Sequence, residues 1–269
     1  MFFRKAFAFI KRDFLIVTSY RFSFFMEIFG IATTLLTFYF IGRLFEGRIV
    51  SHLVPYGGDY FSYVLLGLTL SNYIGTSLSG IMGQINSEQS MGTLEALFVT
   101  PTKIWHLLLS MNLWGFVYNT VEGAFYILFG MILFGVDLTN MNFLSSMIIF
   151  ILTIITFSSL GLLSSAFIIV FKRGDPISWV TGTLMGLLGG VYFPVSIFPS
   201  WLKDISLFLP VTHSIQAMQL AVYKGYSLTM MLPQIGILVI FSLILVPAGF
   251  ISFNYALKKA KKDGSLIQY

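Results

Sequence analysis

The sequence is poor in charge and contains no cysteine. Only 10% of its 269 residues are Asp, Glu, Lys or Arg, whereas a soluble domain carries about 25%. So few charges cannot cover a globular surface in water, and lipid is the natural solvent for the apolar surface that remains. Because cysteine is absent, disulfides and thiolate metal sites are excluded. Cysteine usage therefore does not indicate whether the protein lies in an oxidising or a reducing compartment.

Motifs for catalysis are missing too. The chain has no Gly-rich phosphate loop ending in Gly-Lys-Ser/Thr, so it is not its own P-loop ATPase. It also lacks His-Glu-x-x-His and Gly-x-Ser-x-Gly. The three histidines, His52, His106 and His213, are far apart in sequence and close to predicted span ends. We therefore predict no catalytic residues, no bound metal and no enzymatic activity in this chain.

Long apolar runs dominate the sequence instead. A helix crosses a bilayer with roughly 20 apolar residues. Six runs meet this requirement: Phe22–Leu44, Tyr60–Ile85, Leu107–Gly135, Phe143–Phe171, Pro176–Phe193 and Leu232–Leu257. The fifth is the shortest and continues into a Pro-rich apolar segment. The pattern predicts an all-α polytopic membrane protein whose single transmembrane domain spans residues 1–269.

The distribution of Lys and Arg predicts the orientation. With a cytoplasmic N-terminus, six spans return the C-terminus to the cytoplasm and leave twelve of the sixteen cations inside. Only Arg43, Arg48, Lys203 and Lys224 then face outward. Five or seven spans would put the basic termini on opposite sides. The net charge of +5 is gathered at the chain ends, which fits a membrane surface and not nucleic acid.

Residues 1–20 are predicted to form an amphipathic interfacial helix. Apolar side chains recur at helical spacing on one face, and the basic residues lie on the other side: Phe3, Phe7, Ile10 and Phe14 against Arg4, Lys5, Lys11 and Arg12. Such a helix lies in the headgroup plane with its cations toward anionic lipid. A simple positive-inside anchor is the alternative.

Two rows of small residues predict close helix packing. Gly75, Ser79 and Gly83 repeat every four residues in the second run, and Gly182, Gly186 and Gly190 do so in the fifth. Small residues at this spacing let helix backbones approach in lipid. Packing within one subunit is the favoured interpretation, and packing between two subunits is the alternative.

Two acids fall within predicted spans. Glu122 lies near the middle of the third run, and Glu27 lies about one and a half turns into the first. An intramembrane carboxylate is a functional hypothesis by default. For Glu27 we favour a hydrogen bond to a neighbouring helix. For Glu122 this structural role and a role in the substrate path remain equally open.

The most informative segment is the loop at residues 86–102. It begins with polar residues and then reads as a short amphipathic helix, which Thr93 caps and Pro101 ends. Leu94, Leu97 and Phe98 share its apolar face. A short helix of this kind is suited to a groove on a partner; a plain interfacial turn is the alternative.

This loop resembles that of the permeases of type-two ABC exporters, through Glu88, Gly92-Thr93-Leu94-Glu95, Leu97 and Thr100-Pro101. A second match is Gly190-Val191-Tyr192-Phe193-Pro194, followed by Phe198-Pro199-Ser200-Trp201-Leu202 and Leu209-Pro210-Val211-Thr212-His213. It is similar to the family's outer segment of short re-entrant helices, here residues 194–231. The resemblance extends over nearly the whole chain.

The resemblance implies a homodimer or pseudo-dimer of permease subunits in a prokaryotic plasma (inner) membrane, with both termini cytoplasmic. ATP and Mg²⁺ would bind to separate nucleotide-binding subunits, and the substrate would cross between the two permeases. It also implies that the loop is a coupling helix that transmits nucleotide-driven closure through Glu88, Gly92, Thr93, Glu95, Leu97 and Pro101.

The same resemblance bears on the substrate. Exporters of long glycans in this class carry an Arg/Tyr-rich stretch before the first span, and only Tyr20-Arg21-Phe22 corresponds to it here. An amphipathic substrate such as a drug or lipid is therefore favoured over a cell-surface polysaccharide or glycoconjugate. Tyr192, Phe193 and Trp201, with Glu122, are candidates for the substrate path, although an interfacial aromatic belt is the favoured role for the aromatics.

Two other classes stay as alternatives. An intramembrane lipid enzyme would need convergent polar groups near one interface, and the sequence shows no such cluster. A stand-alone channel or secondary transporter often carries paired repeats with broken spans, and no internal repeat is evident.

Overall fold

The computed structural model describes residues 2–44, 52–56, 58–93, 104–171 and 176–262. Within these ranges all regular secondary structure is helical, as the apolar runs predicted. The α-helices are α1 (Phe2–Ser19), α2 (Arg21–Arg43), α3 (Tyr60–Ser90), α5 (Ile104–Phe134), α6 (Phe143–Phe171), α7 (Pro176–Leu188), α8 (Ser200–Leu207), α9 (Pro210–Tyr223) and α10 (Leu232–Lys262). Short 3-10 turns η1 (Val54–Tyr56), η2 (Val195–Ile197) and η3 (Leu228–Met231) lie between them.

Five of the described helices, α2, α3, α5, α6 and α10, are long and apolar enough to cross a membrane. They correspond to five of the six predicted spans, and α6 has the predicted bounds. Helices α3 and α10 run about one turn beyond the predicted ends, to Ser90 and Lys262. The chain is therefore a multi-pass helical membrane protein.

The predicted fifth span, Pro176–Phe193, differs from the structure. Helix α7 has 13 residues and is thus roughly 20 Å long, short of the ~30 Å hydrocarbon core. It ends at Leu188 because Gly190 adopts φ +82°, a left-handed conformation that favours glycine and turns the chain. After it, α8 and α9 form a pair bent by 87°, which makes a sixth span only if the pair is counted as one.

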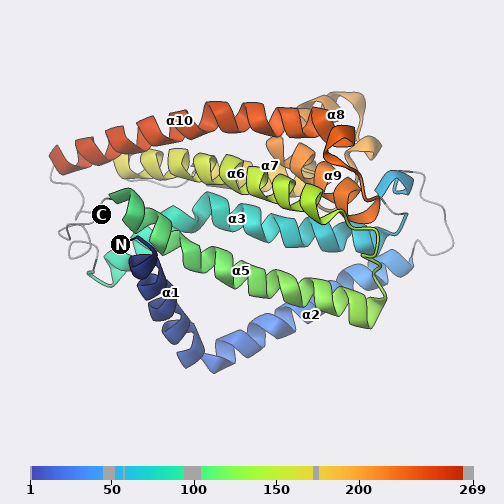
Figure 1. The fold of residues 1–269 in the computed structure, drawn as a ribbon, viewed down its shortest axis with the longest axis horizontal. Coiled ribbons are helices and arrows are strands. Elements are labelled where there is room, and N and C mark those ends of the chain that lie inside the picture. Colours follow the sequence, from blue (N-terminus) through green and yellow to red (C-terminus); the bar gives the residue numbers. More distant parts are fainter. Residues whose placement is uncertain (1, 45–51, 57, 94–103, 172–175, 263–269) are drawn as a thin grey trace.

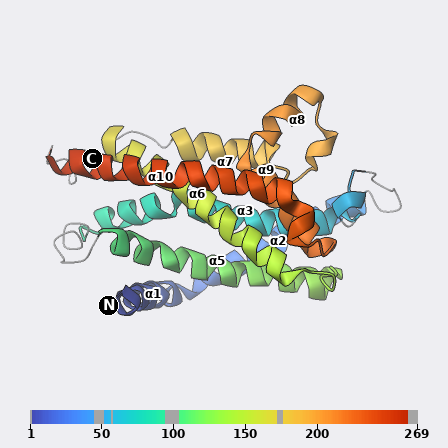
Figure 2. The same ribbon diagram turned by 45° about the horizontal axis from the view of Figure 1, so that its top comes forward.

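The helices lie side by side with both termini at one end of the molecule (Figure 1). The end of α3 and the beginning of α5 lie at that same end, whereas α8 and α9 lie at the other (Figures 1 and 2). Helices α1 and α2 meet in a V at Tyr20, and α1 packs against α5. Helix α3 contacts α5 and α6, and α6 in turn contacts α10.

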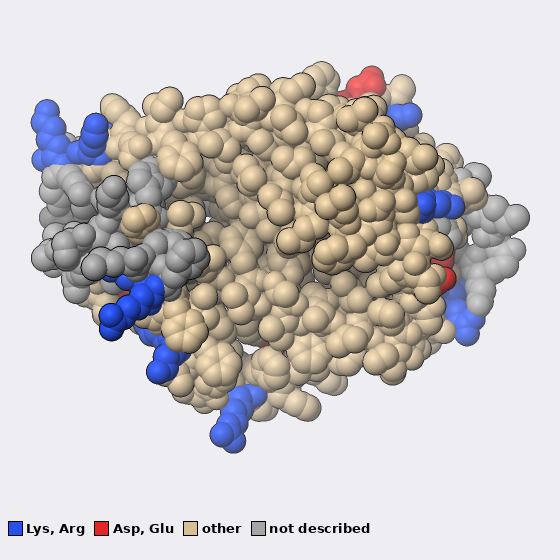
Figure 3. All heavy atoms as spheres, viewed as in Figure 1, with Lys and Arg blue, Asp and Glu red and all other residues tan. Residues whose placement is uncertain are grey.

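Charged side chains gather mostly toward the two ends of the molecule (Figure 3). Apart from basic side chains along the lower edge, the described residues in the middle of this face are drawn in tan, which marks residues other than Lys, Arg, Asp and Glu. Large apolar side chains are also widely exposed, including Phe22 on α2, Ile132 on α5 and Leu243 on α10. An uncharged apolar band between charged ends is the surface expected of a protein in a bilayer.

Glycine provides close helix contacts, but at positions other than those predicted. A Cβ on Gly161 of α6 would lie 2.5 Å from the carbonyl oxygen of Ser77 on α3. By contrast, a Cβ on Gly75, Gly83, Gly182 or Gly186 would meet nothing within 4 Å. The favoured interpretation, packing of both small-residue rows within one subunit, therefore does not hold at these four positions. Gly190 does pack, near the Tyr63 hydroxyl and Val195.

Candidate functional site

The first candidate site is centred on Glu88, in the last turn of α3. Its side chain is 2% exposed although the residue lies at the end of the molecule that carries the termini. Its two carboxylate oxygens accept hydrogen bonds from different partners: Oε1 from Arg12 Nη1 at 2.5 Å and Oε2 from the Thr93 hydroxyl at 2.5 Å. A buried carboxylate needs such partners, because its charge is costly to desolvate.

The chain beyond Glu88 is turned by Gly92. This residue has φ +70°, and the Thr93 N–H donates to the Glu88 carbonyl at 2.9 Å, the long bond of a Schellman motif. In the described structure Thr93 therefore closes the end of α3. Its predicted role as the cap of a following helix, together with Glu95, Leu97 and Pro101, concerns residues 94–103, outside the described residues.

The contacts of Arg12 differ from the prediction that the basic residues of the N-terminal helix face lipid headgroups. Its guanidinium bridges two acids, with Nε 2.7 Å from Asp13 Oδ1 and Nη1 2.5 Å from Glu88 Oε1. Partial burial alone would lower the pKa of Arg12, but the hydrogen bonds to Asp13 and Glu88 raise it above its ordinary value. Phe7 and Phe14 are exposed, as expected for a helix face in lipid.

The two intramembrane acids, widely separated in sequence, line one small pocket between α2 and α5. The Tyr118 hydroxyl donates to Glu27 Oε2. Asn72 Nδ2 donates to Glu122 Oε1 at 2.9 Å. Both carboxylates thus have the helix-to-helix hydrogen bonds that we predicted for Glu27, and they also share a cavity that the sequence did not reveal.

A row of polar contacts continues from Glu122 along the contact between α3 and α5. Asn119 Nδ2 donates to the Asn72 carbonyl at 3.1 Å and to the Thr76 hydroxyl at 2.5 Å. Hydrogen bonds of this kind join helices in lipid, where no water is present to form a hydrogen bond with an unpaired polar group. The position of Glu122 is therefore fixed from α3.

The aromatic candidates for a substrate path do not gather around Glu122. Tyr192 stacks on Phe38 of α2, with ring centroids 5.6 Å apart. Phe193 and Trp201 are exposed, at 49% and 64%. The structure thus brings Glu122 together with Glu27 and places Tyr192 in a separate aromatic contact.

Two of the three histidines, His213 and His52, make polar contacts with neighbouring segments. His213 is buried, and its Nε2 lies 2.8 Å from the Leu207 carbonyl oxygen. The Nδ1 of His52 lies 3.1 Å from the Ser196 hydroxyl. Among the residues that the structure describes, no group of His, Asp and Glu side chains could hold a metal ion.

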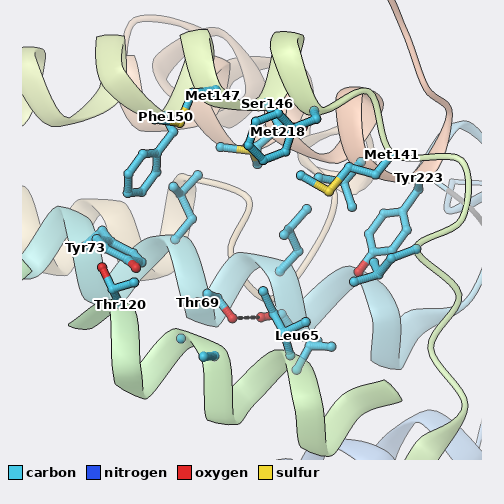
Figure 4. Close-up of a pocket in the computed structure, with 18 residues that line it drawn as sticks. Leu65, Thr69, Tyr73, Thr120, Met141, Ser146, Met147, Phe150, Met218 and Tyr223 are labelled. Carbon is cyan, nitrogen blue, oxygen red and sulfur yellow. Dashed lines mark hydrogen bonds between the residues drawn. The ribbon is translucent and has the colours of Figure 1, made fainter. Parts of the chain in front are cut away.

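A cavity of about 340 Å³ lies between α3, α5, α6 and α9 and was not predicted from the sequence. Figure 4 shows its walls, with Tyr73 and Thr120 at one end and Met141 and Tyr223 at the other. None of the predicted site residues lines it. Only small and hydroxyl-bearing positions such as Gly123 and Thr69, facing one another from α5 and α3, hint at it in the sequence.

Comparison with known proteins identifies the family. The model of the ABC-2 type transporter family matches residues 4–223. The inner membrane transport permease YadH of Escherichia coli K12 is 22% identical over 213 residues, which cover 77% of this chain and 79% of YadH. YadH of Shigella flexneri matches to the same extent. With a family match over most of its length and five apolar helices long enough to span a bilayer, the chain belongs to the ABC-2 type transporter family of membrane permeases.

Proposed function

We propose that this chain is the transmembrane subunit of an ATP-driven exporter that moves an amphipathic substrate, such as a drug or lipid, out of the cell. ATP and Mg²⁺ bind to a separate nucleotide-binding subunit, which docks on the segment that follows α3. The N- and C-termini lie on the cytoplasmic side. Family membership supports the permease role, and the direction, the substrate and the coupling are our inference.

The observation that carries the proposal is the buried Glu88. Through Arg12 and Thr93 it ties α1, α3 and the start of the predicted coupling loop into one unit. A partner that pushes on residues beyond Thr93 therefore acts on α1 and α3 together. The ATPase can drive a conformational change of this unit only if it contacts two arrangements of the unit with different binding free energies.

A second copy of the chain is part of the proposal. Gly75 and Gly83 on α3, and Gly182 and Gly186 on α7, have free space where a Cβ would stand. Rows of small residues in spans serve close helix contacts, and α3 and α7 are in contact with each other. These rows are therefore suited to close packing against helices of a second subunit. The substrate path then lies between the two copies.

The test is co-purification of the permease with a candidate nucleotide-binding ATPase subunit. The double substitution Gly92→Pro, Glu95→Lys alters the proposed docking segment. Its matched control is Gly135→Pro, Asp137→Lys, because Gly135 has nearly the same left-handed φ (+71°) and precedes α6 at the other end of the molecule. We expect the first variant alone to lose the complex or its substrate-stimulated ATP hydrolysis. Equal behaviour of the two variants would refute the proposed docking segment.

A further inference from the structure

We propose that the cavity between α3, α5, α6 and α9 holds one acyl chain of a bilayer phospholipid. Its 18 lining residues include no Asp, Glu, Lys, Arg or His. The polar side-chain groups in its walls are five hydroxyls, and four of them already donate hydrogen bonds within the protein. The Thr69 hydroxyl donates to the Leu65 carbonyl at 2.8 Å, and the Tyr223 hydroxyl donates to the Ser62 carbonyl at 2.6 Å.

Two further hydroxyls, those of Ser146 and Thr120, also donate to backbone carbonyls. The Ser146 hydroxyl donates to the Asn142 carbonyl at 2.9 Å. The Thr120 hydroxyl donates to the Phe116 carbonyl at 2.8 Å, and the Tyr73 hydroxyl lies near it at one end of the cavity (Figure 4). A polar ligand would find few free groups here, so the occupant that suits these walls is a hydrocarbon.

The cavity opens sideways, toward the surface that faces lipid. Its rim includes Phe143, Met147 and Met141, which are 73%, 46% and 38% exposed. On the face in Figure 3 the surface is hollowed between α5 and α6. The material next to such an opening is hydrocarbon and not water. An empty apolar cavity would forfeit the dispersion contacts of its lining, which an entering chain restores.

Size and depth limit the occupant to one chain. The volume of about 340 Å³ is roughly twice the ~150 Å³ that admits a benzene ring, so about a dozen carbon atoms fit. An α-helix of a partner protein, about 10 Å across, does not. Along α3 the lining runs from Leu65 to Tyr73, about 12 Å. That is less than half of the ~30 Å hydrocarbon thickness. The acyl chain therefore belongs to a lipid of the leaflet at the end of the molecule opposite the termini.

Photo-crosslinking tests the site directly. The purified permease is reconstituted with a phospholipid that carries a diazirine in its acyl chain, irradiated and analysed by peptide mass spectrometry. We expect adducts to concentrate on the parts of α3, α5 and α6 that line the cavity. Ala124→Phe fills the cavity from α5 and should abolish these adducts. Leu128→Phe, one turn further on the same helix and outside the lining, should leave them intact.

Ser146→Phe adds a large side chain from the opposite wall, at a small and buried lining position, and repeats the test if Ala124→Phe fails to fold, as judged by its melting temperature and elution profile. Adducts spread evenly over the lipid-facing helices, or unchanged in both filled variants, would refute the site. Displacement of the phospholipid adducts by a transported substrate would also refute it, because the cavity would then belong to the transport path. The readout needs neither ATP nor export, so its failure is separate from failure of the proposed function.

Discussion

Glu88 and its partners are the residues on which the proposed coupling depends most. A carboxylate that is 2% exposed and held by Arg12 and Thr93 responds strongly to the loss of a partner. Breaking a buried ion pair costs about 3–5 kcal/mol, but the Arg12 side chain is 38% exposed, so solvent replaces part of what is lost.

We therefore predict that Arg12→Met destabilises the permease by about 1–2 kcal/mol. Combining it with Glu88→Gln should recover part of the loss, because the uncompensated buried charge is then removed. A double-mutant cycle of melting temperatures measures this coupling. Lys11→Met, which removes an exposed neighbouring cation, is the control and should change little. Strictly additive effects of Arg12→Met and Glu88→Gln would contradict the pairing.

Glu122 offers a second test at the residue scale. Glutamine keeps the oxygen that accepts from Asn72 and removes only the charge. If the carboxylate takes part in transport, Glu122→Gln should lower export by about tenfold, equivalent to ~1.4 kcal/mol, at unchanged membrane abundance. Asp137→Asn, an exposed acid outside the spans, serves as the control. Unchanged export would assign Glu122 a purely structural role.

At the scale of elements, glycine positions divide into those that pack and those that are open. Gly161 of α6 faces backbone oxygens of α3 at 2.5 and 2.6 Å from a hypothetical Cβ. Because backbone cannot yield as a side chain does, α6 must shift if a methyl group is added. Gly236 of α10, which lies outside both small-residue rows, has free space instead.

Gly161→Ala is therefore expected to destabilise the permease by about 1–3 kcal/mol, the usual cost of overpacking. Gly236→Ala should be neutral or stabilise it by up to about 1 kcal/mol, because alanine is the better helix former. Thermal unfolding of the two variants in the same detergent decides between them. Equal melting temperatures would contradict the close contact between α3 and α6.

The spans themselves were largely predictable from the sequence, because hydropathy is a local property. The bounds of α6 are those predicted, and α2, α3, α5 and α10 agree within a few residues. The end of α7 was missed, since the apolar run continues to Phe193 while Gly190 turns the chain. Apolar composition carries no information on whether a glycine adopts a left-handed backbone conformation and ends a helix.

Contacts between elements were not predictable in the same way. Helical spacing placed Arg12 on the basic side of α1, but it carries no information on the distant Glu88 that Arg12 pairs with. The shared pocket of Glu27 and Glu122 and the cavity between four helices arise from tertiary packing as well. Only family resemblance pointed to Glu88 beforehand.

At the scale of the whole molecule, the open small-residue rows predict a second copy. Gly182→Leu, Gly186→Leu should shift the permease from dimer to monomer, because bulky side chains keep helix backbones apart. Gly236→Leu on α10 is the control, since a Cβ there also meets nothing within 4 Å but it lies outside both rows. The molar mass measured by light scattering in detergent gives the oligomeric state. A dimer that survives the substitutions in α7 would exclude this face as the interface.

The segment after α3 is proposed to touch an ATPase subunit, and a chain without cysteine allows a direct measurement of this contact. Leu97→Cys introduces a single thiol in that segment, and Lys203→Cys introduces one on α8, at the other end of the molecule. Each is labelled with a photoreactive maleimide and irradiated in the purified complex. We predict that the ATPase is cross-linked from position 97 and not from position 203. An intact complex with no cross-link from position 97, or with one from position 203, would contradict it.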